Sequence, residues 1–183
     1  MPPEHLSTHL TTGFYGKIPA TGDFVGRGLP GNFVRAWDRW VAAHLAPLQS
    51  SGAWPDHLAL RFILGPDANG PMAGIVLPSH DRAGRRFPLT VASPVSLPTS
   101  SLALTAAEWF AAVEDAADAA RQGELSADEF AGALAELSFP DTRAEDAPLI
   151  GIALWTNGTL PIEVAPDHPV RALEPLLVNR GAA

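Results

Sequence analysis

Charged side chains gather in two short segments that are also rich in turn-forming residues. The first segment is GKIPATGDFVGRGLP, residues 16–30, and the second is SHDRAGRRF, residues 79–87. Carboxylates beside arginines can perform acid–base chemistry, bind a phosphate, or pair with charges on another protein. The candidates for contact with a partner protein are Lys17, Asp23, Arg27, Asp81, Arg82 and Arg85.

Three interpretations of these two segments stay open. The aspartates could cap turns while the arginines are solvated. The segments could instead meet at one end of a sheet and form a mixed-charge recognition surface. A small hydrolase or phosphate-binding enzyme using Asp23, Asp81 and Arg85 is the third alternative, although no partner residue with a defined catalytic role is evident.

The first segment contains two patterns associated with phosphate binding, and neither is complete. GRGLPG at 26–31 satisfies GxGxxG, but no βαβ unit surrounds it, and Pro30 lacks the amide N–H that would face a pyrophosphate. GKI at 16–18 has Ile18 where a phosphate loop needs Ser or Thr for magnesium. A nucleotide site is therefore not expected.

Other catalytic or metal-binding patterns are also incomplete. Ser79, His80 and Asp81 are sequence neighbours whose side chains alternate in direction, whereas catalytic triads are assembled from distant positions. The six histidines are scattered and the chain has no cysteine. We therefore predict no catalytic residue, no cofactor and no metal ion, and we expect a protein that is not an enzyme.

The distribution of charge disfavours nucleic acid as a partner. The chain of 183 residues has a net charge of −8. Residues 101–150 alone carry eleven acidic and two basic side chains, a balance of −9. Such a surface repels a polyanion. No apolar run approaches the roughly 18 residues that a membrane span needs, so we expect no membrane insertion and a cytoplasmic location.

Apolar runs predict the elements that must position the two charged segments. Strands are expected at 13–18, 58–65, 72–79, 87–95, 149–156 and 160–165. Helices are expected after Pro30, with Asn32 as cap, and at two capping boxes, Thr105 with Glu108 and Ser126 with Glu129. The short link between the third and fourth strands requires them to be antiparallel. Residues 1–12 are expected to be a disordered tail, and residues 13–183 a single α/β domain with a mixed, largely antiparallel sheet.

Two long motifs resemble the TagF family of bacterial type VI secretion accessory proteins, also called ImpM. GFYGKIPATGDFVGRGLPGNFVRAWDRWV at 13–41 is similar to that family's Gly-Lys-Leu/Ile-Pro, Gly-Asp-Phe, Arg-x-Leu-Pro and Trp-Asp-x-Trp elements. GIVLPSHDRAGRRFPLTVASP at 74–94 is similar to its Pro-Ser-x-Asp-x-x-Gly-Arg-x-Phe-Pro-Leu segment. One departure is Leu60, where the family often has Trp before Arg-Phe.

The resemblance implies a function and a layered fold. It implies a three-layer α/β/α sandwich and a cytoplasmic protein that represses type VI secretion post-translationally. Repression would act through binding, notably to the forkhead-associated (Fha) scaffold protein, in a pathway opposed by a threonine kinase and phosphatase pair. The glycines and prolines of the first segment would then form a rigid elbow that holds Asp23 and Arg27 for pairing or for contact with the partner.

Overall fold

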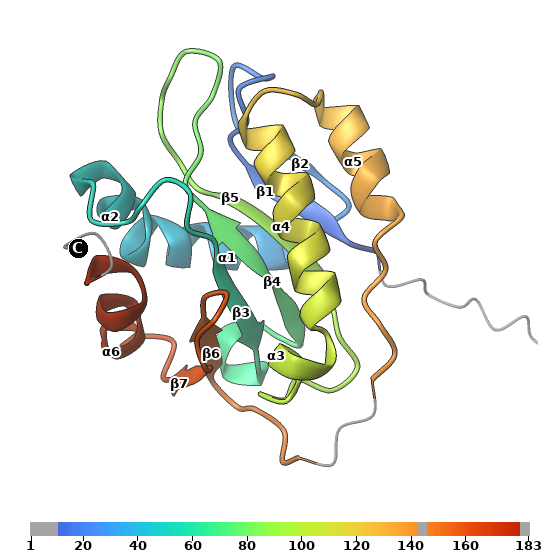
Figure 1. Ribbon diagram of the computed structural model, residues 1–183, viewed down its shortest axis with the longest axis vertical. Coiled ribbons are helices and arrows are strands. Elements are labelled where there is room, and N and C mark those ends of the chain that lie inside the picture. Colours follow the sequence, from blue (N-terminus) through green and yellow to red (C-terminus); the bar gives the residue numbers. More distant parts are fainter. Residues whose placement is uncertain (1–10, 143–145, 180–183) are drawn as a thin grey trace, which may run out of the picture.

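The computed structural model describes residues 11–142 and 146–179, and across these residues seven strands form one sheet. The strand order is β2-β1-β5-β4-β3-β6-β7 (Figure 1). Every pairing between neighbouring strands in this part of the chain is antiparallel, so the expected mixed component is absent from it. The strands are β1 Gly13–Gly16, β2 Val25–Arg27, β3 Leu60–Leu64, β4 Met72–Leu77, β5 Leu89–Pro94, β6 Ile152–Trp155 and β7 Ile162–Val164.

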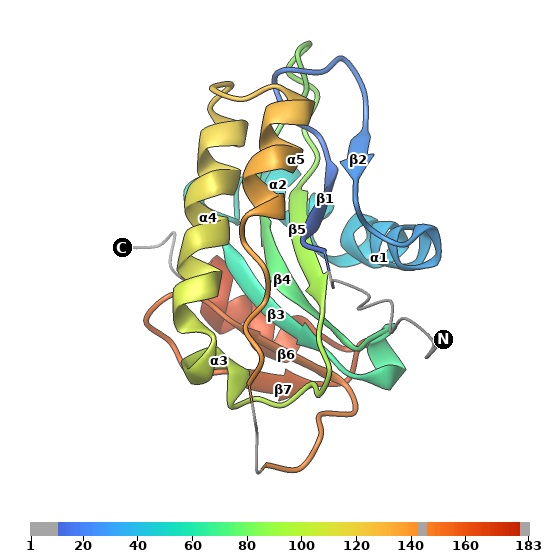
Figure 2. The same ribbon diagram turned by 90° about the vertical axis from the view of Figure 1, so that its right-hand side faces the viewer.

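Helices lie on both sides of this sheet (Figure 2). They are α1 Gly31–His44, α2 Ala46–Ser51, α3 Leu102–Thr105, α4 Ala107–Arg121, α5 Ala127–Ala135 and α6 Val170–Leu173. A π-helical turn over Glu174–Val178 continues α6. The chain is thus helical from Val170 to Val178.

Two hydrophobic clusters form the core, one on each face of the sheet. Successive residues of a strand point to opposite faces, and β3 illustrates this: Ile63 joins the cluster under α4 and α5, while Phe62 joins the cluster under α1 and α6. All residues of β3, β4 and β6 are buried, which explains why their apolar runs lack alternation. The chain is therefore an α/β protein in which each face of the sheet carries its own apolar cluster.

On the α1 face of the sheet, a glycine on β4 leaves space for an aromatic stack. The indole of Trp37 lies 4.5 Å from the ring of Phe62 and donates a hydrogen bond to Thr90 at 2.8 Å. Phe62 pairs across the sheet with Gly74. A Cβ at Gly74 would lie 2.1 Å from the carbonyl oxygen of Val91 and 2.7 Å from the Phe62 ring. Only glycine at this position allows the ring, and hence α1, to pack so closely.

On the α4 face, a buried ion pair connects the sheet to a helix. Nε of Arg61, on β3, lies 2.6 Å from Oε1 of Glu114 on α4. The Arg61 side chain is 6% exposed and its guanidinium also lies over the ring of Phe110. Burying an arginine requires such compensation. Arg61, part of the motif with Phe62, is therefore a packing residue of this chain.

One of the two predicted capping boxes is present and the other is wrong. The Ser126 hydroxyl oxygen accepts a hydrogen bond from the Glu129 amide, and the Ser126 amide donates one to the Glu129 carboxylate. Thr105 instead ends α3, which begins earlier at Leu102, so α4 starts after Ala106 without a side-chain cap. Leu104, in the last turn of α3, is 83% exposed. Two serial helices replace the single one predicted.

The cap assigned to the first helix is also wrong. Asn32 was expected to cap the helix, but α1 begins at Gly31 with Pro30 in the cap position and no side-chain hydrogen bond. The fixed backbone of Pro30 already provides the required extended entry. By contrast, the strands expected at 149–156 and 160–165 are confirmed as β6 and β7, which pair across a turn with Gly158 at φ +86°.

The expected N-terminal tail falls mainly on residues 1–10, which lie outside the described residues. Its last residue, Thr12, is buried and donates a hydrogen bond to the Leu137 carbonyl at 2.6 Å. The indole of Trp109 donates to the same carbonyl at 2.9 Å. The ordered chain is therefore anchored beside the end of α5 before β1 begins.

Candidate functional site

The two charged segments become loops that meet at one end of the sheet. The β1–β2 loop covers residues 17–24 and the β4–β5 loop covers residues 78–88, and both lie at the top of Figure 1. The amide of Arg82 donates to the Thr21 carbonyl at 2.8 Å. Nη2 of Arg85 donates to the Gly22 carbonyl at 2.5 Å. The two loops therefore meet, as the recognition-surface interpretation requires, and the recognition itself stays a prediction.

A second set of hydrogen bonds joins the loops closer to the sheet. The Ser79 hydroxyl donates to the Lys17 carbonyl at 2.6 Å. The guanidinium of Arg82 donates to the Ala20 carbonyl. Each of these bonds ends on a main-chain oxygen of the β1–β2 loop. Together they fix the path of that loop's backbone.

Asp81 organises the junction from the inside. Its side chain is 0% exposed. Oδ1 accepts hydrogen bonds from the amides of Ala83 and Arg85 at 2.9 and 3.0 Å, and Oδ2 accepts one from Nε of Arg85 at 2.8 Å. The ammonium of Lys17 lies 3.5 Å from Oδ2. Both oxygens of Asp81 are thus occupied.

The pKa of Asp81 follows from this environment. Burial raises the pKa, because it disfavours the charged carboxylate. The hydrogen bonds from the Arg85 amide and guanidinium, the charge of Arg85 and the Ala83 amide outweigh burial, so the pKa lies below its ordinary value. Asp81 is therefore a fixed anion at neutral pH.

An aromatic side chain lies on the outer surface of the junction. Phe24 is 42% exposed. Its ring stacks on Tyr15 at 5.7 Å and meets the edge of Phe87 at 4.9 Å. The ammonium of Lys17 lies 4.9 Å above the Phe24 ring. Phe24 is thus held in one orientation by neighbours from β1 and from the β4–β5 loop.

Tyr15 connects this aromatic group to α1. Its hydroxyl donates to Oδ1 of Asp38 at 3.0 Å. Burial, followed by this hydrogen bond and the charges of Asp38 and Asp23, raises the pKa of Tyr15 to about 12. Tyr15 is therefore neutral at physiological pH and serves as a fixed donor.

Comparison with known families assigns the two loops to a described domain. The family model "TagF N-terminal domain, Type VI secretion system-associated" matches residues 13–137, which is more than half of the chain. The chain belongs to the TagF N-terminal domain family. This confirms the resemblance drawn from the two motifs and places the chain among proteins associated with type VI secretion.

A solved structure is similar to this TagF chain over most of its length. The crystal structure of PA0076 from Pseudomonas aeruginosa PAO1 superposes with a TM-score of 0.67 at 29% sequence identity. The similarity covers 85% of each chain. A comparison with curated proteins found no match.

Within this TagF domain, the six candidate contact residues divide by exposure. Asp81 and Lys17 are buried and act on the loops themselves. Asp23, Arg82 and Arg85 are exposed on the two loops. Arg27 is exposed on β2 and lies 3.6 Å from Asp128 of α5, so it faces the helical side of the junction.

Sequence reasoning missed Phe24, the aromatic member of the surface. Exposed aromatics are hard to distinguish from core aromatics in a sequence, because both types flank strands. The signal that could have found it is its place between Asp23 and β2, inside a polar loop. We therefore define the loop surface as Asp23, Phe24, Arg82 and Arg85.

The geometry offers little for catalysis. Asp81 has no exposed oxygen, and Oδ1 of Asp23 accepts the amide of Phe24 at 2.7 Å. Within residues 11–142 and 146–179, no group of three histidine, aspartate or glutamate side chains could hold a metal ion. No helix of the described part is long and apolar enough to cross a bilayer.

Proposed function

We propose that this chain is a cytoplasmic accessory protein that represses type VI secretion post-translationally by binding the Fha scaffold protein. Its action would be linked to a threonine kinase and phosphatase pair. Residues 13–183 would act as one domain, because β6 and β7 complete the sheet that begins in the matched region. Membership of the TagF N-terminal domain family supports a role in this secretion system.

The loop surface is the observation that carries the binding proposal. Aromatic and arginine side chains are enriched among the residues that dominate protein interfaces. Phe24, Arg82 and Arg85 bring these types together on two loops that are hydrogen-bonded to each other. Because the loops are already ordered, binding there loses little conformational freedom.

The two buried residues support the surface without touching the partner. Asp81 holds Arg85 through Nε, which leaves the side chain of Arg85 61% exposed. The ammonium of Lys17 packs against the face of the Phe24 ring. The small-enzyme alternative, which would use Asp23, Asp81 and Arg85, receives no comparable support. Asp81 is enclosed and both of its oxygens are engaged, and Oδ1 of Asp23 accepts the Phe24 amide.

A direct binding measurement with purified Fha protein tests the proposal. Calorimetry should show binding of the unmodified chain, and Phe24→Ala should weaken it about thirtyfold, the effect of an interface anchor worth about 2 kcal/mol. Leu160→Ala is the matched control, because Leu160 is an equally apolar side chain, 82% exposed at the β6–β7 turn. Arg82→Ala should also weaken binding, with Arg35→Ala on α1 as its control.

Two outcomes would contradict the proposal at different levels. Absence of binding by the unmodified chain would remove Fha as the partner. Equal effects of Phe24→Ala and Leu160→Ala would remove the loop surface as the interface. Repression is tested separately: overexpression of the chain in a bacterium with an active system should lower effector release, and unchanged release would refute it.

A further inference from the structure

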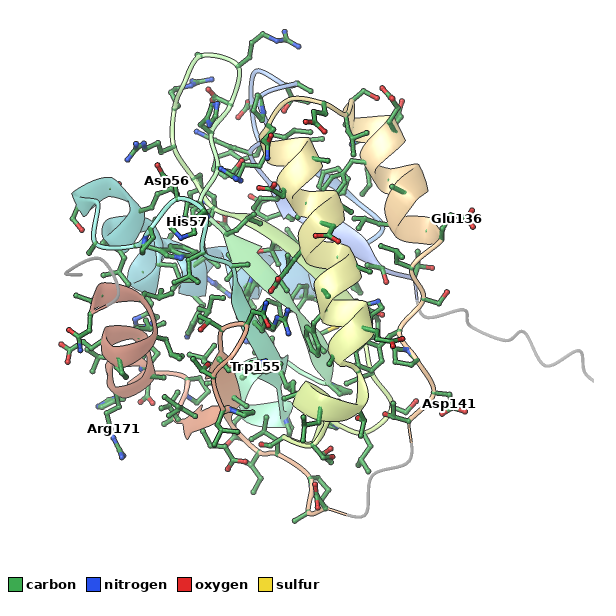
Figure 3. The ribbon with its side chains drawn as sticks, in the orientation of Figure 1. Asp56, His57, Glu136, Asp141, Trp155 and Arg171 are labelled. Carbon is green, nitrogen blue, oxygen red and sulfur yellow. The ribbon has the colours of Figure 1, made fainter. Side chains whose placement is uncertain are left out.

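A small polar pocket lies on the other side of the β4–β5 loop, against α2 and the end of α4. Its volume is about 230 Å³. Figure 3 labels Asp56, which lies between α2 and the base of this loop. The polar side chains that line the pocket are Gln49, Asp56, Ser79, His80, Arg86 and Arg121.

Two arginines and one aspartate, Asp56, supply the charged groups of the pocket. Arg86 comes from the β4–β5 loop, and its Nη1 donates to the main-chain carbonyl of Gln49 at 3.3 Å. Arg121 comes from the end of α4, where its Nε and Nη2 both donate to Oδ1 of Asp118, so Nη1 is the nitrogen left for a ligand. His80 pairs with Arg86 through an antiparallel backbone β-bridge, and its side chain adds imidazole nitrogens to the pocket. Guanidinium groups are the usual protein ligands of phosphate.

A buried hydrogen-bond acceptor accompanies these donors. Gln49 is 3% exposed, and its Nε2 donates to the carbonyl of Ser79 at 2.7 Å. A carbonyl only accepts hydrogen bonds, so this contact fixes which end of the amide is nitrogen. The other end, Oε1, is buried and has no hydrogen-bond donor among the described residues. An unpaired buried acceptor is costly, so a donor from a bound group would relieve it.

We propose that this pocket binds a phosphate group that retains one proton, either inorganic phosphate or a phosphate monoester. Arg86, Arg121 and His80 donate to its ionised oxygens. Gln49 Oε1 and the carboxylate of Asp56 can only accept, so the single P–OH of the ligand donates to one of these two acceptors. A volume of about 230 Å³ lies below the roughly 300 Å³ at which pockets for larger ligands begin, so the pocket matches one phosphate group.

This donor and acceptor set discriminates between anions. Sulfate is fully ionised near neutral pH and offers no hydrogen to Gln49 or Asp56. A phosphate group has its second pKa at about 6 in a monoester, so the protonated form is abundant near that pH. The proposal therefore requires that phosphate binds and that sulfate binds much more weakly. It does not depend on the proposed contact with Fha, which uses the opposite side of the loop.

Titration of the isotope-labelled chain, followed by NMR at about pH 6, tests the site. The probes are sodium phosphate, sodium sulfate at the same ionic strength, and O-phosphoserine. Phosphate should shift the signals of the Gln49 side-chain amide, His80 and Arg86 in a saturable manner, with affinity at least tenfold above that for sulfate. Arg86→Gln should weaken phosphate binding at least tenfold, while Arg35→Gln should leave it unchanged.

The possible results of this titration distinguish a phosphate-monoester site, a site for free phosphate, and general charge attraction. Binding of O-phosphoserine as well as phosphate would identify a monoester site, and binding of phosphate alone would identify a site for the free ion. Equal affinity for sulfate, or no effect of Arg86→Gln, would overturn the proposal in favour of general charge attraction. The absence of saturable shifts with both phosphate probes would also overturn it. Arg86 is exposed, so its replacement leaves the core intact, and the dispersion of the NMR spectrum verifies folding.

Discussion

Replacing Glu114 by glutamine should destabilise the chain strongly, because it leaves Arg61 buried without a counter-charge. The two charged atoms are 2.6 Å apart. At an effective dielectric constant of about 20, their attraction is about 6 kcal/mol. Desolvation of the two groups offsets roughly half of this, so we expect Glu114→Gln to lower the free energy of unfolding by about 3 kcal/mol. For a domain of this length, the melting temperature should fall by about 6–12 °C.

Urea unfolding followed by tryptophan fluorescence measures the effect, since both Trp109 and Trp155 lie on the same face as the pair. Asp115→Asn is the matched control: it removes the same charge from the next residue of α4, which is exposed. The control should change the free energy of unfolding by less than about 0.5 kcal/mol. A loss below about 1 kcal/mol for Glu114→Gln, or an equal loss for Asp115→Asn, would refute the claim that the buried pair anchors α4.

Two other predictions concern helix capping and acid stability. Ser126→Ala should lower the free energy of unfolding by about 1 kcal/mol, and Thr105→Ala by less than about 0.5 kcal/mol. The reason is that, of these two residues, Ser126 caps a helix and Thr105 does not. Equal losses in urea unfolding would contradict the assignment of Ser126 as the cap of α5. The pKa of Asp81 is lowered in the folded chain, so its contribution to stability is present above its ordinary value of 3.8 and is lost as the pH falls through the folded value. Unfolding measured between about pH 5 and pH 2 should show a weaker acid dependence for Asp81→Asn than for the unmodified chain, and parallel curves would argue against it.

Most of the sheet could be predicted from the sequence, because its central strands are buried on both faces. The run around Ile75 is apolar at every position, the run around Phe62 is interrupted only by Arg61, and short links leave only antiparallel pairing. β2 could not be predicted in this way. Its three residues are partly or fully exposed and include Gly26, so neither alternation nor propensity marks them as a strand.

Helix boundaries were less predictable because the apolar spacing continues across breaks. Leu45 and Leu48 continue the stripe of α1, yet the chain turns at Leu45 and starts α2. At the start of α4, the sequence Thr105 to Glu108 has the composition of a capping box, but the preceding turn of α3 already occupies Thr105. Local patterns cannot show which of two overlapping helical turns forms.

The meeting of the two loops was predictable, but the roles of their charged residues were not. β1 lies beside β5, so the loops that precede β2 and β5 must reach the same end of the sheet. The burial of Asp81 depends on donors from its own loop and on Lys17 from the other, which spacing cannot reveal. Contact between the six candidate residues and a partner stays a prediction.

The position of β6 determines where a truncated version of this protein can end. The matched region ends at 137, whereas β6 lies inside the sheet, paired with β3 on one side and β7 on the other. A fragment that stopped at 137 would leave β3 with a bare row of amides and carbonyls, and would uncover the apolar side chains that Ile152 and Leu173 now shield. Such a fragment would be prone to aggregate through the exposed edge of β3. The end of the family match is therefore a poor guide to the shortest fragment that can be expressed in folded form.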